Sequence, residues 1–336
     1  MELIIYLAVI VVSSLVVWKG GGLLERSSDV LSRHYKLSPI VHGGIVTAVG
    51  SSFPELSTTV LSTLLHGEFD LGVSAILGSA IFNILVIPAL GAILAKGIRS
   101  EWSFVMKDVQ FYIISVLVLT LTFALALIHN PQEGKPGVGN LSRWLALIPF
   151  GFYFLYLYFQ QKETKTYQRK KQDSEKTDQI GKVWFRFIIS LILIVLSVEG
   201  LVRSAIFLGD YFDTPSFIWG VLVISTVTSV PDAIISIKEA IHNKGLVSLA
   251  NIVGSNIFDL LIAVPAGVLI AGSSLVNFNV AGPMTLFLGV ATILLIVLLL
   301  RKNHLSVKEA WVLLGIYGVF IAWMIAESAK WLNWLQ

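Results

Sequence analysis

Apolar stretches of about twenty residues recur along the whole chain, and each is long enough to cross a lipid bilayer as a helix. Hydrophobic residues make up 55% of the sequence and charged residues only 13%, against about 25% charged residues in soluble domains. A soluble fold could not bury so much apolar surface, so we predict an all-α integral membrane protein. The ten predicted transmembrane helices lie at residues 3–32, 38–66, 71–95, 107–128, 142–160, 183–211, 216–242, 246–271, 281–300 and 306–332.

Two of the apolar segments carry copies of one polar motif, and each copy contains an acid. The first copy is GSSFPE at residues 50–55, and the second is VTSVPD at 227–232. Each is followed by a second matching segment, GSAIFNIL at 78–85 and GSNIFDLL at 254–261. The prolines of the two copies are 177 positions apart and the glycines that open the later segments are 176 apart. Ionisable groups at bilayer depth mark ion or substrate paths, and their duplication is typical of secondary transporters.

A polar break at residues 161–182 divides the chain into a first five-helix repeat, 1–160, and a second, 183–336. The break carries charges of both signs and is predicted to be a solvated cytoplasmic linker. All but four of the 24 lysines and arginines then fall on the cytoplasmic side, as the positive-inside rule requires, and both termini lie outside. Because five is odd, the second repeat is inverted relative to the first. The two acidic motifs are therefore expected to meet near the bilayer midplane.

A proline stands directly before the acid in each motif. Since proline has no N–H, carbonyl groups near Ala48 and Ser225 are predicted to lose their helical partners and to line a cavity. The glycines Gly78 and Gly254 are expected to let neighbouring helices approach closely. We expect the other intramembrane charges to be structural: Glu199 pairs with Arg203, and His66 lies at an interface.

The motifs bring together oxygen donors of several kinds. Ser79 with Asn83, and Ser255 with Asp259, are each four residues apart and share a helix face. Hydroxyl groups at Ser51, Ser52, Thr228 and Ser229 stand beside the acids Glu55 and Asp232. This set suits the hard cations calcium, magnesium, sodium and potassium. One calcium plus one monovalent ion, or three sodium ions, would neutralise the three acids, and protons could replace metal ions.

Other chemistries find little support in the composition. The chain has no cysteine, which excludes disulfides, thiolate metal sites and thiol catalysis, and none of its six histidines lies in the motifs. Its net charge of +3 is too small and scattered to indicate nucleic-acid binding. We expect no enzymatic activity, no cofactor and no obligate protein partner. The expected partners are the lipid bilayer, calcium and monovalent cations.

The duplicated motifs closely resemble the two alpha-repeats of the calcium/cation antiporter superfamily, which includes the sodium/calcium exchangers. The resemblance covers both halves of the chain and implies ten helices, inverted five-helix repeats and alternating access. It implies that Glu55 and Asp232 are the central calcium ligands. It also implies a set of flanking sodium ligands: the Ala48 carbonyl, Ser51, Ser52, Ser79 and Asn83 in the first repeat, and Ser225, Thr228, Ser229, Ser255 and Asp259 in the second.

At four positions the sequence departs from the usual family pattern, and these departures narrow the choice of branch within the superfamily. Asp232 stands where many sodium/calcium exchangers have glutamate, Val227 where glycine is usual and Ala75 where asparagine is common. Ala80 stands where the second repeat has Asn256. The motifs look most like those of the potassium-dependent branch, in which an aspartate at the position of Asp259 is associated with potassium use.

The leading hypothesis is an antiporter that exchanges calcium for sodium. A proton/calcium antiporter and a potassium-dependent exchanger remain alternatives within the superfamily. A cation channel is the alternative from another class, but channels more often build a pore ring by oligomeric symmetry, whereas here both halves of the site lie in one chain. The short linker suggests a prokaryotic protein, so we expect a multi-pass protein of the plasma (inner) membrane.

Overall fold

The computed structural model describes residues 1–35, 48–99, 106–164, 179–302 and 304–331. In the first half, the helices are α1 (Glu2–His34), α2 (Ala48–His66), α3 (Phe69–Leu94), α4 (Met106–His129) and α5 (Arg143–Thr164). Residues 38–47 of the second predicted helix, and residues 165–178 of the predicted linker, lie outside the described residues.

Two of the predicted spans in the second half are interrupted helices. After α6 (Ile180–Phe212), the chain runs through α7 (Ser216–Trp219), the π-helical turn η3 (Gly220–Ile224), α8 (Ser225–Thr228) and α9 (Val230–Ile241). The next stretch comprises α10 (Gly245–Phe258), the π-helical turn η4 (Asp259–Ala263) and α11 (Val264–Ala271). The last helices are α12 (Phe278–Lys302) and α13 (Val307–Ser328).

Most of these helices could cross a membrane by length and composition. Within the described residues, seven helices satisfy this test, and an eighth does if 216–228 and 230–241 form one span bent by 46°. The two predicted spans left over, α2 and α5, are helical but fall short of it. Helix α2 falls short because its buried side is polar, with Ser51, Ser52, Glu55 and Thr59 among its buried residues. The chain is thus an integral, multi-pass membrane protein.

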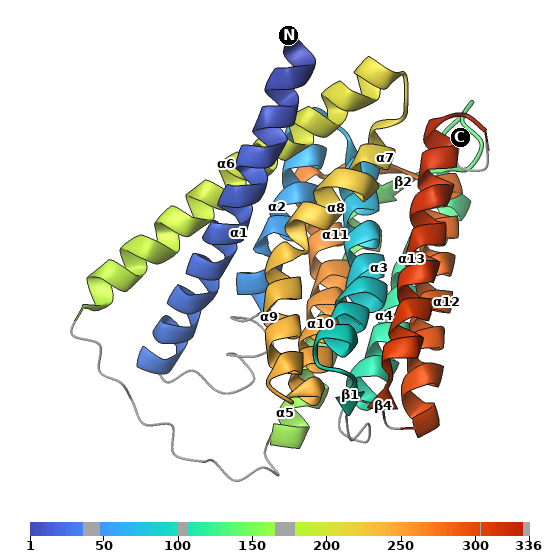
Figure 1. Cartoon of the computed structure of the whole chain (residues 1–336). Coiled ribbons are helices and arrows are strands. Elements are labelled where there is room, and N and C mark those ends of the chain that lie inside the picture. The colour runs from blue at the N-terminus through green and yellow to red at the C-terminus, as the bar shows by residue number, and fades with distance from the viewer. Residues whose placement is uncertain (36–47, 100–105, 165–178, 303, 332–336) are drawn as a thin grey trace.

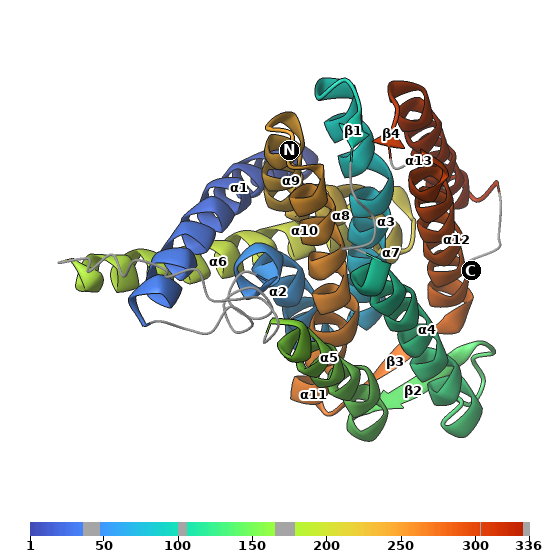
Figure 2. The ribbon, with the colours of Figure 1, turned by 90° about the horizontal axis from the view of Figure 1, so that it is seen from below.

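Helix α3 is the centre of the bundle (Figure 1). In the most apolar part of α3, 83% of residues are buried inside the protein, against 17% in α1. Helices α1 and α6 lie together along one edge (Figures 1 and 2), and both expose large apolar side chains there, such as Val11 and Leu196. These helices therefore face lipid, whereas α3 is surrounded by protein.

The fold is all-helical as predicted, and in addition two short antiparallel sheets connect the halves of the chain. Strand β1 (Ile98–Arg99) pairs with β4 (His304–Leu305), and β2 (Val138–Ser142) pairs with β3 (Ser273–Asn277). The register aligns Ile98 with Leu305, and Asn140 with Leu275. The β1–β4 pair and β2 lie at opposite ends of the bundle (Figure 1). Strand pairing supplies hydrogen-bond partners to the backbone N–H and C=O groups of these connections. The side-chain pattern of the sequence did not reveal the strands.

The two proline motifs differ in their helices. Pro231 lies in the first turn of α9, directly after the break at Ser229. Pro54 lies inside α2, which is helical on both sides of it, so the corresponding break in the first half is not observed. The predicted ion pair between Glu199 and Arg203 is confirmed, with 2.6 Å between the Arg203 Nε and a Glu199 oxygen.

A glycine in the π-helical turn η3 allows this turn to contact α3. A Cβ atom on Gly220 would lie 2.7 Å from both the Leu71 carbonyl oxygen and the Ser74 hydroxyl. We expect Gly220→Ala to lower the free energy of unfolding by about 1–3 kcal/mol, because the backbone of α3 would have to move. The control is Gly289→Ala in α12, where a Cβ atom would have no described atom within 4 Å. Thermal unfolding in detergent measures both variants, and equal melting temperatures would contradict this packing.

Candidate cation-binding site

The three acids of the motifs are buried inside the protein. The exposed fraction of Glu55 on α2 is 1%, that of Asp232 on α9 is 1%, and that of Asp259 at the start of η4 is zero. Asn83 on α3 is equally buried. Glu55, Asp232, Asp259 and Asn83, together with the neighbouring hydroxyl groups of both halves, are called the central site below.

Each Gly-Ser segment contributes one serine that contacts both halves of the chain. It hydrogen-bonds the motif acid of its own half and lies beside a motif serine of the other half. The Ser79 hydroxyl donates to Glu55 Oε1 at 3.3 Å and lies 2.7 Å from the Ser229 hydroxyl. The Ser255 hydroxyl donates to Asp232 Oδ1 at 3.2 Å and lies 3.4 Å from the Ser51 hydroxyl. The two halves therefore contribute matching arrangements to one central site, as the duplicated motifs predicted.

Asn83 of the first half hydrogen-bonds Asp232 and also contacts Asn256 of the second half. Asn83 Nδ2 donates to Asp232 Oδ2 at 3.4 Å and to Asn256 Oδ1 at 3.0 Å. Asn256 Nδ2 in turn donates to the Tyr112 hydroxyl at 3.0 Å and to the Ala80 carbonyl at 3.3 Å. Sequence reasoning missed both Asn256 and Tyr112. The asymmetry between Ala80 and Asn256 was a signal for the first, whereas nothing in the local sequence singles out Tyr112.

Five buried oxygen atoms of the central site have no hydrogen-bond partner among the described residues. They are Ser52 Oγ, Glu55 Oε2, Asn83 Oδ1, and both carboxylate oxygens of Asp259. The Ser52 hydroxyl and the Asp259 carboxylate interact with each other, but without the geometry of a hydrogen bond. Buried polar atoms are almost always paired, so a concentration of unpaired ones indicates a missing ligand. Since all five are oxygen atoms, the ligand they suit is a hard cation.

The donor set of the central site is mixed. Within the part of the chain that the structure describes, no three acidic or histidine side chains lie close enough to hold a metal ion by themselves. Hydroxyl and amide groups separate the acids: Ser79 lies next to Glu55, and Ser255 and Asn83 lie next to Asp232. A cation bound here would therefore combine carboxylate oxygens with neutral ligands, as calcium and sodium both accept.

The remaining candidate residues need separate comment. A freed carbonyl was predicted near Ser225, but the Ser225 carbonyl itself keeps its helical partner: it accepts from the Ser229 N–H at 3.1 Å and from the Ser229 hydroxyl at 2.7 Å. The reason is that Pro231 removes the donor to the residue four positions before it, which is Val227. The Thr228 hydroxyl donates to the Ile224 carbonyl at 3.1 Å and also interacts with Glu55. Ala48 begins α2, and its side chain is outside the described set.

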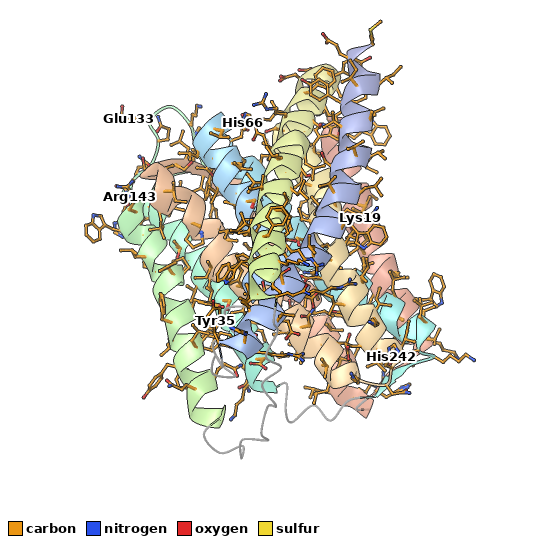
Figure 3. The ribbon with its side chains drawn as sticks, turned by 90° about the vertical axis from the view of Figure 1, so that its left-hand side faces the viewer. Lys19, Tyr35, His66, Glu133, Arg143 and His242 are labelled. Atoms are coloured by element: carbon orange, nitrogen blue, oxygen red, sulfur yellow. The ribbon has the colours of Figure 1, made fainter. Side chains whose placement is uncertain are left out.

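The expectation of close helix approach is confirmed for one of the two glycines. A Cβ atom on Gly78 would lie 3.0 Å from the Ser225 side chain and 3.3 Å from the Val221 Cα, so this glycine brings α3 against α8 and η3. Gly254 has no such neighbour among the described atoms. His66, expected at an interface, lies at the end of α2 and contacts Glu199 at 3.0 Å. Figure 3 shows His66 near the same end of the bundle as Glu133 and Arg143, opposite Tyr35 and His242.

Comparisons with known proteins agree with this architecture. The chain is 25% identical to the inner membrane protein YrbG of Escherichia coli, over 94% of this chain and 95% of that protein. It is 26% identical to the putative antiporter CaxA of Alkalimonas amylolytica, over 87% of this chain and 88% of that protein. Its fold is similar to that of the sodium-calcium exchanger NCX_Mj, with a TM-score of 0.63, 21% identity, and coverage of 95% of this chain and 99% of that one.

A family model supplies the assignment. The model described as "Sodium/calcium exchanger protein" matches residues 5–162 and 182–326, which is most of the chain. The two matched ranges contain the two copies of the acidic motif and of the Gly-Ser segment. The chain therefore belongs to the sodium/calcium exchanger protein family, a family of transporters within the calcium/cation antiporter superfamily.

Proposed function

We propose that this protein is a secondary active antiporter that exchanges calcium for sodium by alternating access. The observation that carries the proposal is the set of unpaired, buried oxygen atoms at Ser52, Glu55, Asn83 and Asp259. Both halves of the chain supply them, and they are carboxylate, amide and hydroxyl oxygens. A site of this kind replaces the water around a dehydrated hard cation, and the exchanger family to which the chain belongs supports calcium and sodium as its ions.

The proposed architecture is ten spans in two inverted five-helix repeats, with α2 and α5 as the two least apolar spans. The two sheets support it: each joins a connection of the first half to a connection of the second, and the β1–β4 pair and β2 lie at opposite ends of the bundle (Figure 1). Under inversion, the 3–4 connection of one repeat lies at the same membrane face as the 4–5 connection of the other. That is the observed pairing.

We propose a topology in which both termini lie outside and the linker 161–182 lies in the cytoplasm. The start of α1 and the end of α13 lie at the same end of the bundle (Figure 1). The end of α5 and the start of α6, which flank the linker, lie at the opposite end. The lysine and arginine bias then places the linker end in the cytoplasm. The inner-membrane location of the relative YrbG supports a prokaryotic plasma membrane for this chain as well.

Asp259 supports a second candidate, in which potassium or a proton takes part in the exchange. Its two carboxylate oxygens are buried and have no hydrogen-bond partner among the described residues, whereas both Asp232 oxygens accept hydrogen bonds. An ionised carboxylate left in such surroundings is costly, so it requires a cation or a proton of its own. The corresponding residue of the first half, Asn83, is neutral and imposes no such requirement.

Calcium flux in sealed vesicles tests the proposal. Purified protein is reconstituted, and calcium uptake is measured under an imposed sodium, potassium or proton gradient, one at a time at fixed membrane potential. We expect an outward sodium gradient to drive uptake at constant pH. Uptake driven only by a pH gradient would favour a proton/calcium antiporter. Calcium movement at equal rates without any gradient of a second ion would favour a channel and contradict exchange.

A further inference from the structure

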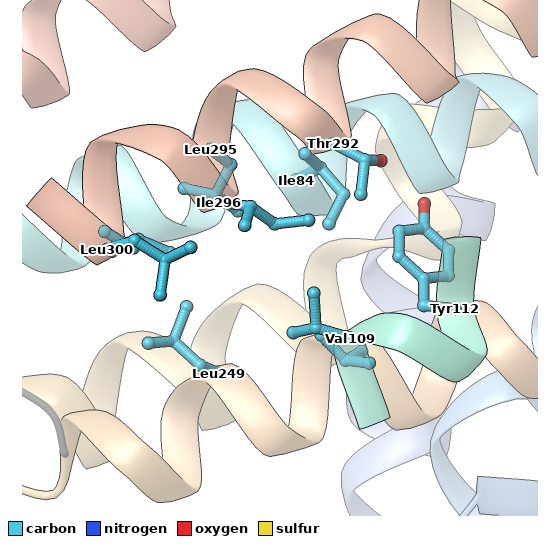
Figure 4. Close-up of a pocket in the computed structure, with 10 residues that line it drawn as sticks. Ile84, Val109, Tyr112, Leu249, Thr292, Leu295, Ile296 and Leu300 are labelled. Atoms are coloured by element: carbon cyan, nitrogen blue, oxygen red, sulfur yellow. The ribbon is translucent and has the colours of Figure 1, made fainter. Parts of the chain in front are cut away.

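A chain of hydrogen bonds leaves the central site at Asn83 and reaches other helices. Asn83 Nδ2 on α3 donates to Asn256 Oδ1 on α10, and Asn256 Nδ2 donates to the Tyr112 hydroxyl on α4. The Thr292 hydroxyl on α12 interacts with Tyr112 and donates to the Leu288 carbonyl at 2.8 Å. Figure 4 shows the Tyr112 and Thr292 hydroxyl groups together at one end of an apolar pocket. Asn256 and Tyr112 lie outside the set of proposed ligands.

One backbone carbonyl determines how the two amide groups in this series of hydrogen bonds are oriented. Asn256 also donates to the Ala80 carbonyl, at 3.3 Å. A carbonyl oxygen can only accept, so the amide group of Asn256 must point its Nδ2 toward Ala80. Its Oδ1 then points toward Asn83, and Asn83 must meet it with Nδ2. The Oδ1 of Asn83 is thereby turned away, and it is one of the buried, unpaired oxygens of the central site.

This orientation matters because only one end of an amide can bind a cation. With Oδ1 toward the ion, Asn83 supplies a neutral oxygen ligand; rotated by half a turn, it would present N–H groups, which repel a cation. The bond to Asp232 at 3.4 Å also favours Nδ2 on this side, but it depends on an acid that the proposed ion engages. The bond to Asn256 is shorter, at 3.0 Å, and is independent of the ion.

The two halves of the chain differ as this role requires. The counterpart of Asn83 is Asp259, a carboxylate, which offers an oxygen in either orientation. The counterpart of Asn256 is Ala80, which has no polar side chain. The amide of Asn83 in the first half is thus matched by a polar residue, Asn256, in the second half. The carboxylate of Asp259 in the second half is matched by an alanine, Ala80, in the first half.

We propose that Asn256, oriented by the Ala80 carbonyl, is a positioning residue that holds the Asn83 amide with its oxygen toward the transported cation. This inference rests on the proposed function, since it assumes that Asn83 is an ion ligand. Tyr112 supports Asn256 but does not set its direction, because the Ala80 carbonyl alone is enough to do so.

Equilibrium binding of radioactive calcium to purified protein in detergent tests this inference. We expect Asn256→Leu, which keeps the size of the side chain, to weaken calcium binding by roughly three- to tenfold, the change expected for one net hydrogen bond. Asn256→Ala is the second variant, in case leucine does not fit. Tyr112→Phe is the matched control: it removes a bond from the same chain but keeps the Ala80 contact, so calcium affinity should change by less than about twofold.

A double-mutant cycle separates orientation from general disruption of packing. In an Asn83→Asp background, position 83 has an oxygen in either orientation, so Asn256→Leu should no longer weaken calcium binding. The same loss in both backgrounds, or equal losses for Asn256→Leu and Tyr112→Phe, would overturn the positioning role. Wild-type protein that binds no calcium at millimolar concentrations would instead refute the proposed function, which distinguishes the two failures.

Discussion

Glu55→Gln is expected to abolish calcium transport while leaving the protein folded. The substitution keeps the shape of the side chain and removes one negative charge from a buried position, where one carboxylate oxygen has no hydrogen-bond partner in the described structure. An amide in its place halves the number of oxygen atoms and adds N–H groups, which a divalent cation does not tolerate. The measurement is calcium uptake into vesicles under a sodium gradient, with the amount of protein and its melting temperature as checks on folding.

The chain offers a matched control for this substitution. Glu327 on α13 is also fully buried, but it accepts a hydrogen bond from Trp323 at 3.3 Å and lies outside the central site. Glu327→Gln should therefore retain transport, since the new side chain can still accept this bond. Calcium uptake near the wild-type rate by well-folded Glu55→Gln protein would contradict the role of Glu55 as a calcium ligand.

Asp259→Asn is expected to change both the stability of the protein and the monovalent ion that it uses. Within the described part of the chain both oxygens of Asp259 are buried without a hydrogen bond, so an uncharged amide of the same size should stabilise the ion-free protein, by about 1–3 kcal/mol. Calcium exchange should persist but lose any dependence on potassium, or show a different pH profile if a proton neutralises Asp259. Thermal unfolding without ions, and calcium flux against potassium concentration and pH, measure the two effects.

Asp232→Asn is the comparison for Asp259→Asn. Asp232 accepts from Ser255 at 3.2 Å and from Asn83 at 3.4 Å, so the same substitution there disturbs existing hydrogen bonds and should not stabilise the protein. It should also abolish calcium transport. Superimposable flux curves and equal melting temperatures for wild type and Asp259→Asn would mean that Asp259 does not affect which ions are exchanged, or how many.

The composition of the central site was largely predictable because duplication provides an internal comparison. Ser79 and Ser255 occupy equivalent positions in the two copies of one segment, and the structure places each against the acid of its own half. A lone proline and acid, such as Pro54 with Glu55, would have been equally consistent with a simple helix kink. The family resemblance added roles for these residues that spacing alone does not supply.

The features that were missed depend on contacts between segments far apart in the sequence. Asn256 contacts Ala80 and Tyr112, which are 176 and 144 residues away, and no local pattern specifies such pairs. The same applies to the β2–β3 sheet, whose strands are short and lie in connections without clear alternation. The π-helical turn at Asp259 was also not predicted, because no local sequence pattern marks it. The intact bond of the Ser225 carbonyl, in contrast, follows from the position of Pro231, whose missing N–H affects Val227.

The position of bound calcium in a crystal of the protein tests the central claim most directly. Anomalous scattering from calcium, or from strontium soaked in its place, locates the ion independently of any side-chain interpretation. We predict a peak within about 2.3–2.6 Å of oxygen atoms of both Glu55 and Asp232, which weakens as sodium concentration is raised. A calcium peak that contacts neither acid, in crystals of protein that transports calcium, would contradict the central site described above.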